Sequence, residues 1–379
     1  MNFSFTKEQE LIQKMAKDYA DKFIEPIAHQ IDVENTIPEE IIKGLAELDL
    51  FGIPFSDEYG GAGAGYASYV LAMEQIGSKS SGVGMIVSAH TLGLGAIDAF
   101  GTEEQKKKYM PRACKGEDIV SFAFTEPGTG SDPKQITSTA KKEGDYYILN
   151  GTKRFITNAG YHGPIVFFAK EEETGRVTGF LVDKFCEGYS ISEPWEKLGM
   201  HGGALLDVYL KDVKIPVENI LGGLGQGYPI LQFAISYGKV GVSSTALGGA
   251  LAAFNESVKY AKEKTHRDKP IADFQAIKLY IAEIAQKYEA CRWLTYRLGY
   301  LADNVRDPVQ FAKEAALAKD FVCDQIVDIS KLAVSVHGSY GLMADYKVER
   351  LWRDSIMGLQ IEGVSSMQKM IIAGVILGG

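Results

Sequence analysis

Apolar residues change their spacing twice along this chain, and no other feature of the sequence constrains the fold as strongly. In the N-terminal part they recur every three or four residues, as on one face of a helix, starting with Leu11, Ile12, Met15, Tyr19 and Phe23. The middle of the chain instead holds short runs of β-branched and aromatic residues. Helical spacing returns near Tyr228 and continues to the C-terminus. We therefore expect an α+β multidomain protein with a β domain between two helical domains.

Two capping boxes mark expected helix starts in the N-terminal helical domain, which we place at residues 1–117. Thr6 and Thr102 are each followed three residues later by glutamine, the order that satisfies free N–H groups where a helix begins. The helix after Thr102 is expected to end at Pro111, because proline disrupts a helix interior. Further helical patterns cover residues 38–48, 66–76 and 83–100.

The β domain is expected at residues 118–225. Six segments have the composition of strands: 118–126, 145–157, 163–170, 177–183, 188–192 and 205–215. No helical pattern separates successive segments, so the alternation of a dinucleotide-binding fold is missing and an antiparallel sheet or barrel is predicted. The glycine run at residues 223–227 is interpreted as a hinge. Residues 226–379 are expected to form a C-terminal four-helix bundle.

Composition and charge narrow the class of partner. Apolar residues make up 46% and charged residues 23% of 379 residues, which is typical of a globular protein with a large core. Acidic residues outnumber basic ones by 49 to 40, and no basic block is present. The sequence therefore does not favour binding to nucleic acid.

Cysteines and histidines show no metal-binding or disulfide pattern. The four cysteines are far apart and include no C-x-x-C pair, and the six histidines lack ligand spacing. We therefore expect no metal site, and a location in the reducing cytoplasm.

The N-terminus mixes both charge signs, unlike a signal peptide. The apolar stretch at residues 83–100 contains Ser88, His90 and Asp98, so no membrane span is expected.

Two segments of the expected β domain carry side chains suited to binding. The first, FAFTEPGTGSD at residues 122–132, turns from a strand into a run of glycines and hydroxyls, where backbone can approach a flat or anionic ligand closely. The second, FITN at residues 155–158, ends a strand with an aromatic ring and then a hydroxyl. An ordinary surface loop and strand end remain the alternatives.

A third segment places Glu362 in an apolar run directly before Gly363, near the start of the last helix. A buried carboxylate resists ionisation, which suits a general base that works near neutral pH. A solvated glutamate at a helix start has the same local sequence, so the segment alone leaves both interpretations open. His90 is interpreted as a core histidine.

Together, TEPGTGSD, FITN, DFQAI and the terminal EG resemble the motifs of the acyl-CoA dehydrogenases. The order of the domains is similar too, and the resemblance covers essentially the whole chain. It implies an FAD enzyme that forms a 2-enoyl-CoA from a saturated CoA thioester, or catalyses the reverse reduction. It also implies electron-transfer flavoprotein as the electron acceptor, and a homodimer or homotetramer.

The resemblance also implies individual roles. Glu362 would be the base, and its backbone N–H would polarise the thioester oxygen. Some relatives carry the base at the position of Gly238, which cannot act here. Substrate contacts are implied for Ser131, Lys239 and Gly363. Contacts to FAD are implied for Phe122, Phe124, Thr125, Gly130, Ser131, Phe155, Ile156, Thr157, Lys264, Arg267 and Gln275, the last of them across a subunit interface.

Several positions depart from the family pattern. Lys264, Ser335 and Val364 replace residues expected around the ADP half of FAD, and a lysine cannot form the forked phosphate contact of an arginine. Arg267 is expected to compensate. Gly84 stands where glutaryl-specific relatives carry arginine, which argues against a dicarboxylic substrate.

Two other functions fit the same residues. An acyl-CoA oxidase would pass its electrons to oxygen. A non-catalytic scaffold subunit that binds CoA thioesters and has lost FAD would account for the altered positions, although it would not explain the retained Glu362. The sequence leaves the acyl group and the direction of the reaction open.

Overall fold

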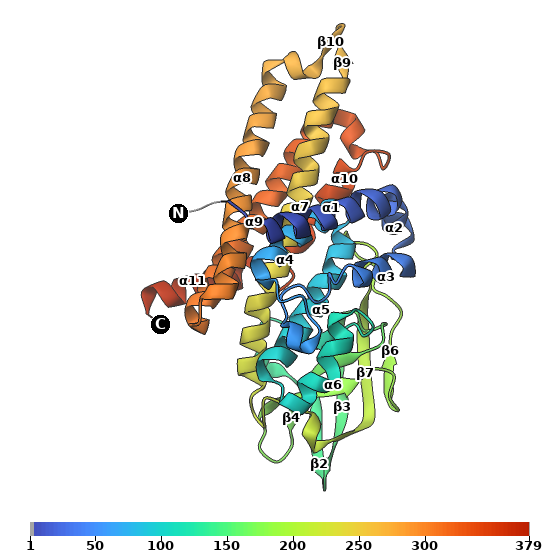
Figure 1. The fold of residues 1–379 in the computed structure, drawn as a ribbon, viewed down its shortest axis with the longest axis vertical. Helices are drawn as coiled ribbons and strands as arrows, with labels where there is room; N and C mark the ends of the chain where they lie inside the picture. The colour runs from blue at the N-terminus through green and yellow to red at the C-terminus, as the bar shows by residue number, and fades with distance from the viewer. Residues whose placement is uncertain (1–3, 379) are drawn as a thin grey trace.

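The computed structural model describes residues 4–378, arranged in three parts along the long axis of the molecule (Figure 1). The sheet lies at the bottom, the first helices cross the middle, and long helices of the C-terminal part rise to the top. The order of helical, β and helical parts confirms the predicted fold class.

The N-terminal part is helical, as predicted. Its α-helices are α1 (Lys7–Tyr19), α2 (Ala28–Glu34), α3 (Glu39–Glu47), α4 (Gly65–Gly77), α5 (Ser81–Phe100) and α6 (Glu103–Cys114). Both predicted capping boxes form, at Thr6 and at Thr102. The prediction that Pro111 ends α6 is wrong, because the helix continues to Cys114. Proline has a φ that suits a helix, and one missing hydrogen bond is tolerated this close to the end.

The middle part contains an eight-stranded sheet. Its strands are β1 (Ser121–Ala123), β2 (Thr139–Glu143), β3 (Tyr146–Thr157), β4 (Pro164–Glu171), β5 (Val177–Asp183), β6 (Tyr189–Ile191), β7 (Leu205–Pro216) and β8 (Ile220–Leu221). The order is β6-β7-β3-β2-β4-β5-β8, with β1 beside β4. Most pairs are antiparallel, as predicted, but β1 and β2 each run parallel to β4. The pattern did not predict β2, whose residues are mostly exposed and charged.

The C-terminal part is a helical bundle, as predicted. Its helices are α7 (Gly227–Glu263), α8 (Gln275–Asn304), α9 (Pro308–His337), α10 (Val348–Gly358) and α11 (Ser365–Leu377). A short hairpin of β9 (Thr265–His266) and β10 (Lys269–Pro270), which was not predicted, joins α7 to α8 at the top of the molecule (Figure 1).

Helices α5 and α7 connect the bundle to the sheet. Val83 and Val87 of α5 belong to the core shared with the bundle, whereas Leu92 and Leu94 belong to the core that includes β4 and β5. Helix α5 is the one described helix long and apolar enough to cross a bilayer, and most of it is buried inside the protein. It therefore has the surroundings of a core helix.

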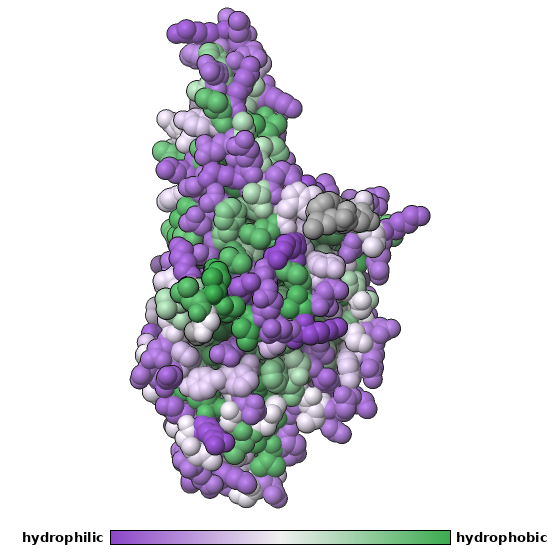
Figure 2. All heavy atoms as spheres, turned by 90° about the vertical axis from the view of Figure 1, so that its left-hand side faces the viewer, coloured by the Kyte–Doolittle hydropathy of each residue, from purple (hydrophilic) through white to green (hydrophobic). Residues whose placement is uncertain are grey.

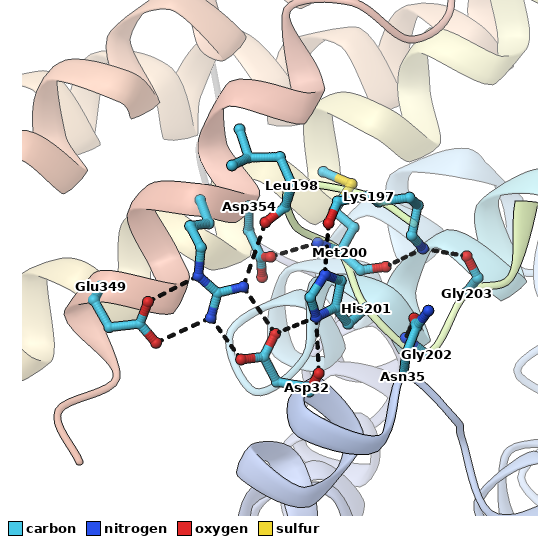
Figure 3. A network of polar contacts seen from close by, with 11 residues as sticks. Asp32, Asn35, Lys197, Leu198, Met200, His201, Gly202, Gly203, Glu349 and Asp354 are labelled. Carbon is cyan, nitrogen blue, oxygen red and sulfur yellow. Dashed lines mark hydrogen bonds and ion pairs between the residues drawn. The ribbon is translucent and has the colours of Figure 1, made fainter. Parts of the chain in front are cut away.

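A polar network joins the three parts near the middle of the molecule (Figure 3). Asp32 of α2 accepts hydrogen bonds from the guanidinium of Arg353 on α10, at 2.5 and 3.1 Å. Both ring nitrogens of His201 face oxygens, with Nδ1 2.7 Å from the Asp32 carbonyl and Nε2 2.9 Å from the Lys197 carbonyl. The loop before β7 is thus held between the first and last parts of the chain.

One side of the bundle exposes apolar side chains. Figure 2 shows them gathered near mid-height on the side where Figure 1 places α8 and α11. The large apolar residues exposed on α8, α9 and α11 include Leu279, Tyr300, Phe321, Met370 and Ile376. Apolar surface of this kind is typical of protein contact sites.

Candidate active site

Two of the predicted binding segments meet in the part of the molecule that contains the sheet. The first follows β1 and contains Thr125, and the second ends β3 and contains Phe155. The backbone N–H of Arg154 donates to the carbonyl of Thr125 at 2.8 Å, which fixes the two segments side by side. Two pieces of chain some thirty residues apart therefore form one surface.

Phe155 projects from this surface because the strand is irregular there. The register between β3 and β7 shifts between Lys153 and Ile156, and Phe155 has a φ of +60°, which is rare for a bulky residue. Its ring is 50% exposed and meets Trp195 edge to face at 5.5 Å. Residues with a strained backbone are concentrated at active sites and ligand-binding sites.

The donor groups of this surface fit a flavin nucleotide. The hydroxyls of Thr125, Ser131 and Thr157 form no hydrogen bond to any other described residue, so they are free to bind a ligand. A Cβ atom added at Gly128 or Gly130 would meet nothing within 4 Å, which shows open space beside the loop. Hydroxyls, an exposed ring and open backbone together suit a polar aromatic cofactor.

Two predicted contact residues face the core instead. Phe124 and Ile156 are buried, and the ring of Phe124 packs on Phe168 at 5.2 Å. The ring of Phe122, which is partly exposed, packs on the same side chain at 5.0 Å. Phe124 and Ile156 could therefore contact a ligand only through their backbone.

Glu362 lies in a tight turn between α10 and α11. Its φ is +51° and that of Gly363 is +90°, so both residues have left-handed backbone. Lys319 of α9 donates to the Gly363 carbonyl at 2.8 Å, and Gln368 donates to the carbonyls of Glu362 and Gly363 at 3.1 and 2.8 Å. The backbone N–H of Glu362 has no partner among the described residues. The turn is thus fixed, with one N–H left free.

The Glu362 carboxylate rests against helix α7. A Cβ atom added at Gly238 would lie 3.0 Å from Oε2 of Glu362 and 2.8 Å from Cδ1 of Leu92. Because Gly238 has no side chain, the Glu362 carboxylate has room to lie against α7. No described residue donates a hydrogen bond to this carboxylate.

Loss of water around the turn raises the pKa of Glu362 to about 7, although the positive charges of Lys239 and Lys319 act in the opposite direction. Lys239, next to Gly238 on α7, is buried, and this burial lowers its pKa to about 8. A carboxylate with a pKa near neutrality can both take up and release a proton under ordinary conditions.

The residues expected at the ADP half of FAD lie elsewhere in the chain. Lys264 and Ser335 line a cavity of about 370 Å³ near the β9–β10 hairpin. Arg267 and Gln275 are exposed in the same region, at the top of Figure 1. Within one chain, these residues lie around the hairpin at the top of the molecule, whereas the Phe155 surface belongs to the sheet (Figure 1). Val364 lies apart from this cavity, beside Glu362, where it caps α11.

His90 lies in the protein core. Its side chain is fully buried, its Nδ1 accepts a hydrogen bond from the N–H of Val120 at 3.0 Å, and Nε2 has no partner. Burial lowers its pKa to about 3, so the ring is neutral. In the part of the chain that the structure describes, no group of three histidine, cysteine or carboxylate side chains could hold a metal ion.

Sequence reasoning missed two lysines that shape these sites. Lys153 is buried behind the Phe155 surface and donates to Glu126 at 2.7 Å, and Lys319 holds the Glu362 turn. Neither lysine stands in a motif. One signal could have indicated them. Each lysine stands at a position of its strand or helix where the spacing of apolar residues predicts an apolar side chain.

Comparison with known proteins gives one family. The chain matches the acyl-CoA dehydrogenase N-terminal domain over residues 6–117, the middle domain over residues 121–213 and the C-terminal domain over residues 225–377. It is 42% identical to a 3-(aryl)acrylate reductase of Clostridium sporogenes, over 98% of this chain and 99% of that protein.

Two further matches cover almost the whole chain. Subunit CarC of the caffeyl-CoA reductase-Etf complex of Acetobacterium woodii is 38% identical over 98% of this chain and 99% of that protein. The structure of butyryl-CoA dehydrogenase from Megasphaera elsdenii superimposes with a TM-score of 0.96 at 32% identity, over the full length of both chains. The fold and the order of the domains are therefore shared throughout.

Proposed function

Because the chain belongs to the acyl-CoA dehydrogenase family, we propose that Glu362 moves the proton at the α-carbon of a CoA thioester. Enzymes of this family interconvert saturated and α,β-unsaturated CoA thioesters, and this chain is one of these oxidoreductases. FAD, the cofactor of the family, supplies or accepts the hydride at the β-carbon when it is bound.

One observation supports this assignment above the others: Glu362 combines a pKa of about 7 with a carboxylate that no described residue hydrogen-bonds. A base must be free to form a new bond to the proton it removes. The unpartnered N–H of the same residue could donate to the thioester oxygen, where negative charge develops as the α-proton leaves. One turn would then supply both the base and a donor to the oxygen.

We assign the flavin ring to the surface around Phe155. The free hydroxyls of Thr125 and Thr157 would bond to polar ring atoms, while the exposed Phe155 ring would cover one face. Gly130 and Ser131 would approach the remainder through backbone and hydroxyl. Phe124 and Ile156 would contribute backbone alone.

The other predicted FAD residues support a shared site. Lys264, Arg267 and Gln275 lie in or beside the β9–β10 hairpin at the top of the bundle, whereas Phe155 belongs to strand β3 of the sheet (Figure 1). We therefore propose that the cofactor of one chain reaches the hairpin region of a second copy, in a homodimer or homotetramer. The exposed apolar side chains of α8 and α11 are consistent with such an assembly (Figure 2).

The relatives favour an aryl-substituted enoyl thioester as substrate and reduction as the direction. The two similar proteins reported above are named as a 3-(aryl)acrylate reductase and as a subunit of a caffeyl-CoA reductase. In the reductive direction, protonated Glu362 delivers its proton to the α-carbon. Electron-transfer flavoprotein is the proposed electron partner, in line with the complex named for one of these relatives.

The visible spectrum of the purified protein, followed by titration with thioesters, tests this function. Wild-type protein should show bound FAD. The dithionite-reduced protein should be reoxidised faster by cinnamoyl-CoA than by crotonyl-CoA. Equal turnover with air and with electron-transfer flavoprotein, with formation of peroxide, would instead indicate an oxidase. Failure to bind FAD even in excess would indicate the scaffold function.

A further inference from the structure

Glu126 closes the loop that carries Gly130 and Ser131. Its backbone forms two hydrogen bonds with Thr129, at 3.0 and 3.1 Å, at the entrance of the loop. Its carboxylate reaches the exit of the loop, where the backbone N–H groups of Thr137 and Ser138 donate at 2.6 and 3.0 Å and both hydroxyls donate at 2.6 Å. One side chain therefore joins the two ends of the loop.

Lys153 ties this loop base to strand β3. Its ammonium donates to Oε1 of Glu126 at 2.7 Å and to the carbonyl of Phe124 at 3.3 Å. The side chains of Lys153 and Glu126 are 0% and 2% exposed. Because Lys153 lies two residues before Phe155, the ion pair spans both segments of the Phe155 surface.

The surrounding sequence makes room for this arrangement. A Cβ atom at Gly151 would lie 2.1 Å from Oγ of Ser138, so the hydroxyl that bonds to Glu126 fits only over a glycine. The ammonium of Lys153 and the hydroxyls of Ser138 and Thr137 hold the pKa of Glu126 at about 2, against the effect of burial. The carboxylate is therefore ionised near neutral pH.

Fold stability alone does not account for such a pair. Removing two charges from water costs about as much as their attraction returns, and apolar replacements are often as stable. A buried pair can instead fix one arrangement of the chain among several. Here the fixed elements are the loop from residue 127 to residue 136 and the irregular end of β3.

We propose that Glu126 and Lys153 are positioning residues that hold the loop and Phe155 in the arrangement that FAD requires. The inference rests on the proposed function, because it takes the Phe155 surface as the flavin site. Both side chains are closed off from solvent, so they act through the backbone of the loop and do not touch the cofactor.

The test compares Glu126→Gln with Asp32→Asn. Asp32 also accepts hydrogen bonds from a cation in a largely buried network, but its carboxylate contacts Arg353 and His201 at the domain junction (Figure 3) and no described residue of the loop. FAD is titrated into each apoprotein, and the melting temperature and the flavin absorption bands are recorded. Glu126→Gln should raise the dissociation constant of FAD roughly tenfold or more, and shift the bands toward those of free FAD. Asp32→Asn should lower the melting temperature without either effect.

A double variant, Glu126→Gln with Lys153→Met, covers the case in which the single variant does not fold, because it leaves no unpaired buried charge. It should fold and bind FAD as weakly as the single variant. Wild-type affinity and bands in either variant would overturn the inference, as would a double variant that fails to fold. Wild-type protein that does not bind FAD would overturn the proposed function instead.

Discussion

Glu126 and Glu362 are two carboxylates beside buried lysines, yet their environments have opposite effects. At the loop base, the pKa of Glu126 is lowered to about 2. In the turn before α11, the pKa of Glu362 is raised to about 7. Burial raises the pKa of both carboxylates, so it accounts for the high pKa of Glu362 but not for the low pKa of Glu126.

Direct hydrogen-bond donors explain the low pKa of Glu126. Lys153 and four N–H or O–H groups of Thr137 and Ser138 contact the Glu126 carboxylate directly and stabilise its charge. Lys239 and Lys319 influence Glu362 only through their charge, since neither donates to its carboxylate. The same pair of residue types thus gives an ionised structural carboxylate in one region and a carboxylate that titrates near neutral pH in the other.

The largest expected effect comes from Glu362→Gln. The amide occupies the same space but cannot accept a proton, so the transfer of the α-proton should slow by roughly 10²–10⁴-fold. FAD content and thioester binding should stay close to wild type. Stopped-flow measurement of flavin reduction by a saturated thioester checks this. A flavin-replete variant that is reduced at a near-normal rate would exclude Glu362 as the base.

The pH dependence of the reaction separates the two carboxylates. With Glu362 as the proposed base, dehydrogenation requires its deprotonated form, so the rate of dehydrogenation should rise with pH through about 7. Reduction of an enoyl thioester needs the protonated form, so its rate should fall over the same interval. Glu126 should contribute no inflection, because it stays ionised. Single-turnover rates in both directions measure this, and profiles that change in the same direction would contradict it.

A smaller effect is expected from Gly238→Ala. The added methyl would meet the Glu362 carboxylate at 3.0 Å and Leu92 at 2.8 Å, and would displace the carboxylate. We expect a loss in rate of about tenfold or more, since small misplacements of reacting groups are costly. Gly249→Ala, on the same helix, is the matched control, because its Cβ would meet nothing within 4 Å. Equal rates in the two variants would show that Gly238 does not set the position of the carboxylate.

Local patterns in the sequence predicted much of this molecule. The capping boxes at Thr6 and Thr102 and most strands depend on neighbouring residues, and they form as expected. The Glu126–Lys153 contact joins residues 27 apart in the chain, and no local pattern encodes it. The same holds for Lys319, which reaches the Glu362 turn from another helix.

The candidate site shows the same limit. The residues of the Phe155 surface and Glu362 were indicated by motifs, but the sequence could not show that Glu362 rests on Gly238. Contacts of this kind depend on how two helices pack, which the sequence of either helix does not specify.

The smallest effect is expected from Lys239→Met, which removes one of the two charges that favour ionised Glu362. Methionine has a similar length and suits a buried position, so the packing should be retained. Without the ammonium, the pKa of Glu362 should rise, and the midpoint of the pH profile should move to higher pH. The shift is limited because the Lys319 charge remains. Lys239→Arg keeps the charge and serves as control. The single-turnover profiles described above measure the midpoint, and a midpoint that stays in place or falls in Lys239→Met alone would show that Lys239 does not act on Glu362 through its charge.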